Sequence, residues 1–219
     1  MFIVIDGLDG SGKSSVAAKL LNSLPDAEAL EFPRYKNKSS ALVKMYLGGE
    51  ITADPKDITP YAAASMFALD RYISFKTGDW ATTNEKLYIS DRYVSSNIIY
   101  QMTKLPPRER EAFALWLYDF EFNKLGLPKP DLTIYLDQLP SLSQKFLEQR
   151  YKLSGGAKDI HESDTEFLTH CRTEILKILP TLGWTKIECF EGETPKTLKQ
   201  ITAEVRAELE KCLNSEPLN

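Results

Sequence analysis

The sequence predicts a three-layer α/β/α protein, in which a parallel sheet of five strands lies between two layers of helices. Five short apolar runs alternate with longer segments of helical period along the chain. Strands that are separated by helices are typical of a parallel sheet with helices on both faces. The 219 residues suffice for one large domain with a buried core. We therefore expect a single domain over residues 1–219.

The expected elements of the N-terminal part follow the order strand, helix, strand, helix and helix, over residues 2–6, 13–24, 29–32, 39–47 and 59–76. The first strand is an apolar run that ends at Asp6. Pro33 closes the second strand, because proline has no N–H to donate to a sheet. Gly48 and Gly49 end the first of the two later helices. Pro60 begins the other, at a first-turn position that tolerates proline.

The remaining elements follow the order strand, helix, helix, strand, two helical stretches, strand and helix. They cover residues 86–91, 95–102, 106–124 and 132–137, two stretches on either side of a Ser-Gly-Gly break at 154–156, then 186–190 and 195–213. Pro106 and Pro107 begin one of the helices, and Pro128 and Pro130 precede the fourth strand. The pattern thus supplies a helix for every crossover that a parallel sheet needs.

Residues 7–14 follow the first strand and fit the phosphate-binding pattern G-x-x-x-x-G-K-[ST] in full. Backbone N–H groups of such a loop converge on phosphate oxygens, so side chains must be absent where the backbone approaches. Lys13 is expected to reach the β- and γ-phosphates, and the Ser14 hydroxyl is expected to bind Mg²⁺. The following helix directs its positive end at the same phosphates. The residues expected to bind the triphosphate are Gly7, Asp9, Gly10, Ser11, Gly12, Lys13, Ser14 and Ser15.

The composition argues against several classes of protein. A net charge of −4 and a pI near 5.4 disfavour a broad nucleic-acid-binding surface. The chain has no apolar run long enough to span a membrane, and Asp6 and Asp9 interrupt the apolar N-terminus, so no secretory signal is expected. Cys171, Cys189 and Cys212 match neither a zinc site nor a disulfide framework. We therefore expect a cytoplasmic protein with free thiols, no nucleic-acid partner and no membrane contact.

The phosphate loop alone does not distinguish a GTPase, a motor ATPase and a small-molecule kinase. The Asn-Lys pairs at 37–38 and 123–124 lack the Asp of a guanine-reading motif, and the chain is short for a motor ATPase. A small-molecule kinase needs a second phosphate site opposite the loop, built from arginines, whose planar fork matches phosphate oxygens. Arg34 and Arg92 follow the second and third strands, where a parallel sheet binds its ligands.

Several motifs, taken together, resemble the thymidylate kinase family of P-loop nucleoside monophosphate kinases. They are the 7–14 loop with Asp9, Phe32-Pro33-Arg34-Tyr35, Phe67 with Arg71, Asp91-Arg92-Tyr93-Val94-Ser95-Ser96-Asn97, and the segments 126–131 and 158–162. The resemblance spans nearly the whole chain in the right order. It implies the P-loop kinase fold and transfer of the γ-phosphate of ATP to thymidine monophosphate (dTMP), giving dTDP and ADP in dTTP synthesis. It also implies Mg²⁺ as the cofactor.

The resemblance further implies an acceptor site for dTMP. Phe67 would stack on the thymine ring and Arg71 would bind its exocyclic oxygen, and their spacing of four residues allows both to lie on one helix face. Arg34 and Arg92 would clamp the acceptor phosphate. Tyr100 would lie under the deoxyribose and exclude a 2′-hydroxyl. The dTMP-binding residues implied are Asp9, Phe32, Pro33, Arg34, Tyr35, Phe67, Arg71, Arg92, Asn97, Tyr100 and Gln101.

Catalysis would need no general base, because the attacking phosphate oxygen is already ionised near neutral pH. The expected catalytic residues are Lys13, Arg92, Asp9 and Arg150. Asp9 resembles the carboxylate that binds the sugar 3′-hydroxyl, and Asp91 could hold a Mg²⁺-bound water. Some relatives carry an arginine where this chain has Gly10, so a cation from a mobile lid should replace it. We expect this lid over about residues 150–162, with Arg150 as the cation.

Two alternatives stay open at this level. One is another nucleoside monophosphate or deoxynucleoside kinase of the same architecture, and the other is a nucleotide-dependent switch that has no small-molecule acceptor. In a deoxynucleoside kinase, a carboxylate such as Asp91 would act as the base for a sugar hydroxyl. The resemblance also implies a homodimer, for which the apolar stretch at 62–75 is a candidate surface.

Overall fold

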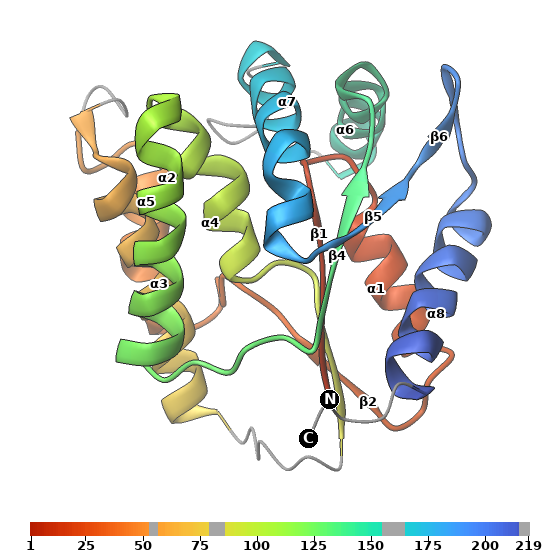
Figure 1. The fold of residues 1–219 in the computed structure, drawn as a ribbon, viewed down its shortest axis with the longest axis horizontal. Coiled ribbons are helices and arrows are strands. Elements are labelled where there is room, and N and C mark those ends of the chain that lie inside the picture. Colours follow the sequence, from red (N-terminus) through yellow and green to blue (C-terminus); the bar gives the residue numbers. More distant parts are fainter. Residues whose placement is uncertain (53–56, 79–85, 155–164, 215–219) are drawn as a thin grey trace.

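The computed structural model describes residues 1–52, 57–78, 86–154 and 165–214 of the chain. A five-stranded parallel sheet runs through its centre in the order β2-β3-β1-β4-β5 (Figure 1). The strands are β1 (Phe2–Gly7), β2 (Ala27–Leu30), β3 (Leu87–Ser90), β4 (Leu132–Asp137) and β5 (Thr185–Glu188). The central strand β1 pairs with β3 and β4, which places Gly7 beside Leu136. The predicted α/β fold with a parallel sheet is confirmed.

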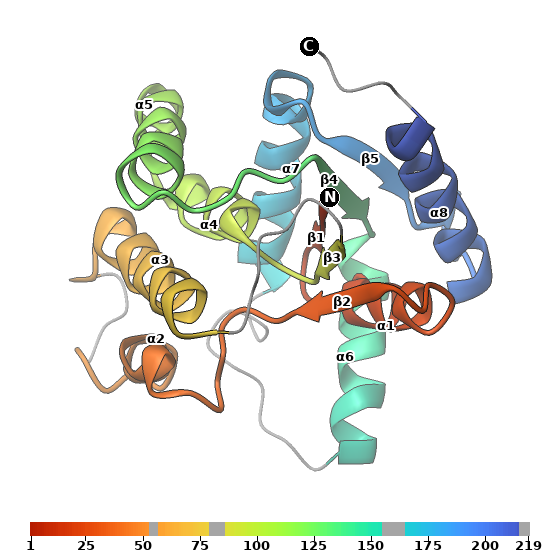
Figure 2. The same ribbon diagram turned by 90° about the horizontal axis from the view of Figure 1, so that it is seen from below.

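Helices cover both faces of the sheet (Figure 2). They are α1 (Lys13–Leu21), α2 (Ala41–Leu47), α3 (Pro60–Thr77), α4 (Val94–Tyr100), α5 (Pro107–Tyr118), α6 (Pro140–Ser154), α7 (Thr165–Leu182) and α8 (Leu198–Asn214). In both ribbon views α1 and α8 lie on one side of the strands, and α4 and α7 lie on the other (Figures 1 and 2). Helices α3 and α5 lie outside α4, away from the sheet. Of this outer layer, α3 supplies one wall of the candidate active site.

The core is divided by the sheet, because alternate strand residues point to opposite faces. Ile5, Ile134 and Leu136 pack with residues of α1 and α8, whereas Val4 and Tyr135 pack with residues of α4, α5 and α7. Burial of apolar surface on both faces stabilises a parallel sheet and explains why its strands are apolar runs. The phosphate loop begins at the edge formed by the carboxyl ends of these packed strands.

Several predicted boundaries are wrong by a few residues. The helix expected over 95–102 starts at Val94 and ends at Tyr100, and a short 3-10 turn, η3 (Met102–Lys104), follows it. The helix expected over 106–124 changes after Tyr118 into a π-helical turn, η4 (Asp119–Lys124). The 3-10 turn η1 (Lys38–Ser40) precedes α2, and an antiparallel hairpin of β6 (Phe190–Glu191) and β7 (Thr194–Pro195) delays the last helix to Leu198.

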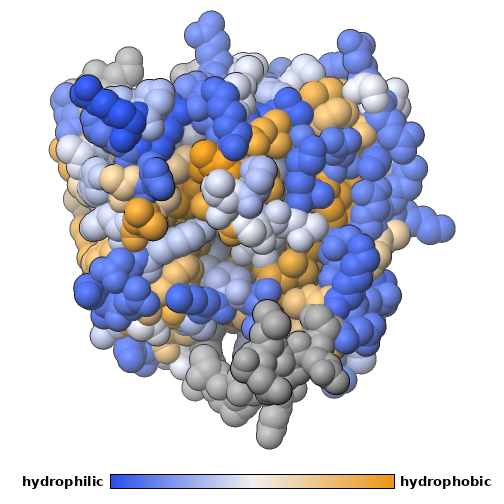
Figure 3. All heavy atoms as spheres, in the orientation of Figure 1, coloured by the Kyte–Doolittle hydropathy of each residue, from blue (hydrophilic) through white to orange (hydrophobic). Residues whose placement is uncertain are grey.

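The surface of the described residues is mixed in character. Hydrophilic residues dominate the side formed by α8, as the right-hand part of Figure 3 shows. Part of the apolar stretch suggested as a subunit surface is instead core, because Ala63 and Ala64 are fully buried. The three cysteines form no disulfide. Among the described residues no helix has the length and hydrophobicity required to cross a membrane.

Candidate active site

The phosphate loop joins the end of β1 to the start of α1. Gly10 and Gly12 have φ values of 79° and 89°. Residues other than glycine rarely adopt this left-handed backbone conformation. The Lys13 ammonium lies within the loop, where its Nζ donates to the carbonyl oxygen of Leu8 and to Asp9 Oδ1, both at 3.2 Å. Ser14 and Ser15 are exposed on the first turn of α1. The loop therefore has positive φ angles at two of the glycines of the phosphate-binding pattern.

Helix α6 packs against the loop at Gly10. A Cβ atom at this position would lie 2.5 Å from the carbonyl oxygen of Ser143, whereas a Cβ at Gly12 would meet nothing within 4 Å. The absence of a side chain at Gly10 is thus a packing requirement of this chain as well as a conformational one. An arginine at this position would need α6 to be placed differently.

Asp9 connects the loop to α4 and to the end of β3. Its carboxylate binds Lys13, forms an ion pair with Arg92 and accepts a hydrogen bond from the Tyr100 hydroxyl at 2.9 Å. Burial would raise the pKa of Asp9, but the charges of Arg92 and Lys13 and the bond from Tyr100 lower it well below its ordinary value. Asp9 is therefore an ionised group shared by two cations.

The partners of Asp9 are shifted in turn. Burial and the neighbouring Arg92 lower the pKa of Lys13. Burial and the negative charge of Asp9 raise the pKa of Tyr100 well above its ordinary value, so the phenol stays protonated and remains a donor. Burial opposes the charge of Arg92, but Asp9, Tyr100 and Asp6 together outweigh burial and raise the pKa of Arg92 above its ordinary value. Asp9 thus stays ionised, Arg92 stays charged and Tyr100 stays neutral throughout the ordinary pH range.

Arg92 has an unusual backbone conformation for a residue with a side chain. Its φ of 114° lies in the left-handed region, and its carbonyl oxygen accepts a hydrogen bond from Ser90 Oγ at 2.7 Å. The guanidinium lies over the Tyr100 ring, with Cζ 5.8 Å from the ring centroid. Such strained residues concentrate at functional sites, because the surrounding structure must hold them in place.

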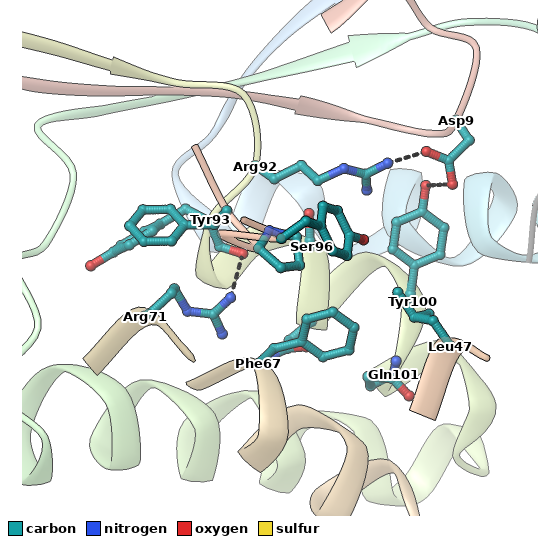
Figure 4. Close-up of a pocket in the computed structure, with 13 residues that line it drawn as sticks. Asp9, Leu47, Phe67, Arg71, Arg92, Tyr93, Ser96, Tyr100 and Gln101 are labelled. Atoms are coloured by element: carbon teal, nitrogen blue, oxygen red, sulfur yellow. Dashed lines mark hydrogen bonds and ion pairs between the residues drawn. The ribbon is translucent and has the colours of Figure 1, made fainter. Parts of the chain in front are cut away.

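A pocket opens beside this cluster (Figure 4). Arg92 and Tyr93 lie on one side of it, and Phe67 and Arg71 project from α3 on the other. The residues that line it are Asp9, Phe32, Pro33, Tyr35, Leu47, Phe67, Arg71, Arg92, Tyr93, Ser96, Asn97, Tyr100 and Gln101. Except for Arg34, every residue that the sequence assigns to dTMP binding lines this one pocket. The pocket combines several aromatic rings with two guanidinium groups.

Arg34 does not line the pocket, although its neighbours on both sides do. Two hydrogen bonds hold the Arg34 backbone. The Arg34 N–H donates to Asp70 Oδ2 at 3.0 Å, and the Arg34 carbonyl oxygen accepts from Ser40 Oγ at 2.9 Å. The buried Asp70 carboxylate also accepts from Ser39 Oγ at 2.6 Å. A role of Arg34 in holding the acceptor phosphate stays a prediction.

Three further expected residues lie away from the pocket lining. Ser14 is exposed on α1, Asp91 is half-buried after β3, and Arg150 is exposed near the end of α6, where it donates to the Tyr151 hydroxyl at 2.8 Å. Hard oxygen donors such as those of Ser14 and Asp91 are what Mg²⁺ prefers, and Mg²⁺ needs only one or two protein ligands when phosphates complete its shell. Of the expected lid, residues 155–162 lie outside the described part of the chain.

The structure also reveals carboxylates that the sequence did not single out. Glu121 binds Arg71 through two hydrogen bonds of 2.6 Å each. Asp137, at the end of β4, binds Arg172 of α7 through bonds of 2.6 and 2.9 Å. Asp6 accepts bonds from Ser95 and Ser96 at the start of α4. Asp6 and Asp137 end strands at the ligand-binding edge, a signal that could have identified them, whereas Glu121 has no such signal.

Comparison with known proteins places this geometry in context. The family model described as "Thymidylate kinase" matches residues 5–201. The thymidylate kinase of Mycobacterium tuberculosis is 34% identical over 190 residues, which are 84% of this chain and 87% of the relative. The probable thymidylate kinase of Pyrobaculum calidifontis is 31% identical over 212 residues, 95% and 99% of the two chains. The solved structure of thymidylate kinase from Candida albicans aligns with a TM-score of 0.68 and 26% identity, over 98% of this chain and 93% of that one.

Proposed function

Because the chain belongs to the thymidylate kinase family and transfers phosphate from ATP to dTMP, we propose that the two substrates meet at Asp9. In this proposal the ATP phosphates lie on the loop of residues 7–15, and dTMP lies in the pocket between α3 and α4. The observation that carries the proposal is the sharing of Asp9 between Lys13 of the loop and Arg92 of the pocket. One carboxylate thus marks the boundary between the donor and acceptor sites.

The donor site follows from the loop. Backbone N–H groups of Gly10 and Gly12 lie where no side chain blocks a phosphate, and Lys13 would bind the β- and γ-phosphates. Ser14 and Asp91 would fit Mg²⁺, Asp91 through a water, because Ser14 offers an oxygen donor on the first turn of α1 and Asp91 offers one directly after β3. When bound with ATP, Mg²⁺ offsets the negative charge of the phosphate oxygens.

The acceptor site follows from the pocket lining. Phe67 would stack on the thymine ring, and Arg71, Asn97 and Gln101 would contact its polar edge. The acceptor phosphate would lie at Arg92, within reach of the loop.

Phe32, Pro33 and Tyr35 would close the side of the acceptor pocket nearest β2. Arg34 is proposed as a second phosphate ligand on the same segment, whose backbone Asp70 anchors.

Phosphoryl transfer then requires positioning and charge, because the attacking phosphate oxygen carries no proton that must be removed. Lys13 and Arg92 are held by Asp9 in this structure, and the incoming phosphates would take the place of that carboxylate. Both cations would then flank the transferring group and stabilise the charge that spreads over its oxygens. Asp9, released from the two cations, would accept a hydrogen bond from the 3′-hydroxyl of the deoxyribose.

Two further parts of the proposal concern specificity and water exclusion. Tyr100 is buried beneath Arg92 with its hydroxyl on Asp9, where its ring would occupy the space of a ribose 2′-hydroxyl. Arg150 would supply the additional cation from a lid, and closure of the lid would exclude water from the reaction. Arg150 lies near the end of α6, the helix that leads toward the expected lid.

We also propose that the protein is a homodimer, with a cytoplasmic location as the sequence predicts. Exposed apolar side chains gather on two helices that pack against each other, Leu42 and Met45 of α2 and Leu69 and Ile73 of α3. Exposed apolar patches of this kind mark protein interfaces. Light scattering would test it: a monomer mass at micromolar concentration would contradict the proposal.

The proposed function is tested by measuring ADP formation with dTMP, thymidine, dUMP, CMP and AMP as acceptors. We expect turnover to be fastest with dTMP and absent with thymidine, because Arg92 needs an acceptor phosphate. Lys13→Ala should abolish turnover while thermal unfolding shows a folded protein. Preferred turnover of thymidine or AMP would contradict the proposal, as would wild-type rates in the Lys13→Ala variant.

A further inference from the structure

Glu121 is a buried carboxylate at the base-binding end of the pocket. It lies in the π-helical turn η4, it is fully shielded from solvent, and Arg71 of α3 is its ion-pair partner. Arg71 Nε donates to Oε2 and Arg71 Nη2 donates to Oε1, each at 2.6 Å, which is the two-point geometry of a strong carboxylate–guanidinium pair. Because Glu121 is not a pocket-lining residue, it acts from behind Arg71.

The pair fixes how Arg71 faces the pocket. A guanidinium has five N–H donors, and Glu121 occupies two of them while the Tyr93 carbonyl oxygen occupies a third at 3.4 Å. The remaining donors belong to the Nη1 and Nη2 end of the group, which is part of the pocket wall. Arg71 therefore presents hydrogen-bond donors, in one orientation, to whatever lies against Phe67.

The same carboxylate fixes the amide of Asn97. Asn97 Nδ2 donates to the Ala64 carbonyl oxygen at 3.2 Å and to Glu121 Oε1 at 3.3 Å. A flipped amide would place its oxygen against these two acceptors, which is unfavourable in a buried site. The amide oxygen is consequently the part of Asn97 that can serve the pocket, and it can only accept.

The pocket edge thus offers a donor from Arg71 next to an acceptor from Asn97. A 4-oxo pyrimidine presents the complementary pair, an acceptor at its C4 oxygen and a donor at N3–H. A 4-amino pyrimidine presents the reverse pair, so that donor would face donor and acceptor would face acceptor. Unpaired buried polar groups are costly, so such a mismatch discriminates strongly between ligands.

We propose that Glu121 is the positioning residue for base specificity: by holding Arg71 and Asn97 in one polarity, it makes the pocket select 4-oxo over 4-amino pyrimidine nucleotides. The proposal rests on the placement of the base in this pocket under the proposed function. It concerns the polarity of the base edge and not the 5-methyl group, so dTMP and dUMP are affected alike. Glu121 itself touches no substrate atom.

The test compares kcat/KM for dTMP, dUMP and dCMP in the wild type and in Glu121→Gln. The substitution keeps the shape but replaces one acceptor oxygen by an amide donor, which frees Arg71 or Asn97 to turn. We expect the dTMP/dCMP ratio of kcat/KM to fall about tenfold or more, as befits the loss of a charge-assisted bond. The dTMP/dUMP ratio and the KM for ATP should stay as in the wild type. Asp119→Asn, an exposed carboxylate of the same turn, is the matched control and should change neither ratio.

The outcomes separate the two proposals. A folded Glu121→Gln variant that loses activity on dTMP and dCMP equally would overturn the role of Glu121, because a merely structural role predicts an equal loss. If Glu121→Gln does not fold, the test uses Glu121→Asp. This variant keeps the negative charge in the core, but its side chain is one methylene shorter and would hold Arg71 and Asn97 less well. An unchanged dTMP/dCMP ratio in that variant would overturn the role as well. A wild type that does not phosphorylate dTMP would instead contradict the proposed function itself.

Discussion

The contact between α6 and the phosphate loop can be tested by placing a methyl group at two glycines of the same loop. Gly10 and Gly12 have similar left-handed φ values of 79° and 89°, so alanine costs about 1–2 kcal/mol of backbone strain at either position. Only at Gly10 would the new Cβ overlap a backbone atom, at 2.5 Å from the Ser143 carbonyl oxygen. The two variants therefore differ in one term alone, the steric overlap with α6.

The size of that term follows from the distances. An ordinary contact between a Cβ atom and such an oxygen has a distance of at least about 3.4 Å, so the start of α6 would have to move by nearly 1 Å. Overpacking of this kind costs about 1–3 kcal/mol of stability. We expect Gly10→Ala to lower the free energy of unfolding by about 2–5 kcal/mol and Gly12→Ala by about 1–2 kcal/mol. In thermal unfolding of a chain this size, each kcal/mol lowers Tm by about 2–4 °C.

Urea unfolding without nucleotide measures both variants against the wild type, with the slope of the transition as a check that all three expose the same surface. The absence of nucleotide matters, because bound ligand would add its own stabilisation to the folded state. Equal losses in the two variants would show that α6 does not constrain the loop. A greater loss in Gly12→Ala than in Gly10→Ala would refute the steric argument outright.

Three further expectations concern activity. Tyr100→Ala should raise the rate with the ribonucleotide relative to dTMP, whereas Tyr100→Phe keeps the ring and should preserve discrimination; equal discrimination in the alanine variant contradicts the role. Asp9 has a lowered pKa, so its favourable contribution to stability is complete above its ordinary pKa near 3.8 and is lost only as pH falls further toward the folded-state value. Because Asp9 stays ionised near neutral pH, we expect kcat/KM to show an acid limb near about pH 6 that reports the second ionisation of the acceptor phosphate; an acid limb at the lowered pKa of Asp9 instead would contradict this assignment. Arg150→Ala should lower kcat with little change in Tm, and an unchanged kcat would place the extra cation elsewhere.

The sheet and the phosphate loop were predictable from the sequence because each depends on local pattern. The fourth strand, Leu132–Asp137, was predicted with its observed bounds, since an apolar β-branched run after two prolines has few other structures available. The hairpin of β6 and β7 was missed, because strands of two residues carry no detectable alternation. The π-helical turn after Tyr118 was missed because its residues continue the helical period of α5.

The pocket was predictable only in part, for a physical reason. Residues that bind a ligand in a parallel sheet follow the strands, so Arg92 could be placed at the site from its position after β3. Glu121 is 50 positions from Arg71 along the chain, and nothing in its surroundings distinguishes a buried carboxylate from a solvated one. Its importance depends on how α3 and the π-helical turn pack. Sequence patterns thus locate groups that touch a ligand better than the groups that hold them.

The ion pairs that Asp9 forms with Lys13 and Arg92 suggest how an acidic chain could bind two highly charged phosphate ligands. Lys13 and Arg92 are each neutralised by the same carboxylate, so neither is an isolated buried cation while the site holds no substrate. A phosphate that binds Lys13 replaces one partner of Asp9 and leaves the carboxylate with Arg92 alone. An acceptor phosphate must then displace Asp9 from Arg92, and the released carboxylate stays close to both anions unless a sugar hydroxyl donates to it. In the proposed arrangement, binding of ATP and of dTMP would therefore be coupled through Asp9, and the 3′-hydroxyl of the acceptor would contribute to that coupling by donating a hydrogen bond to Asp9.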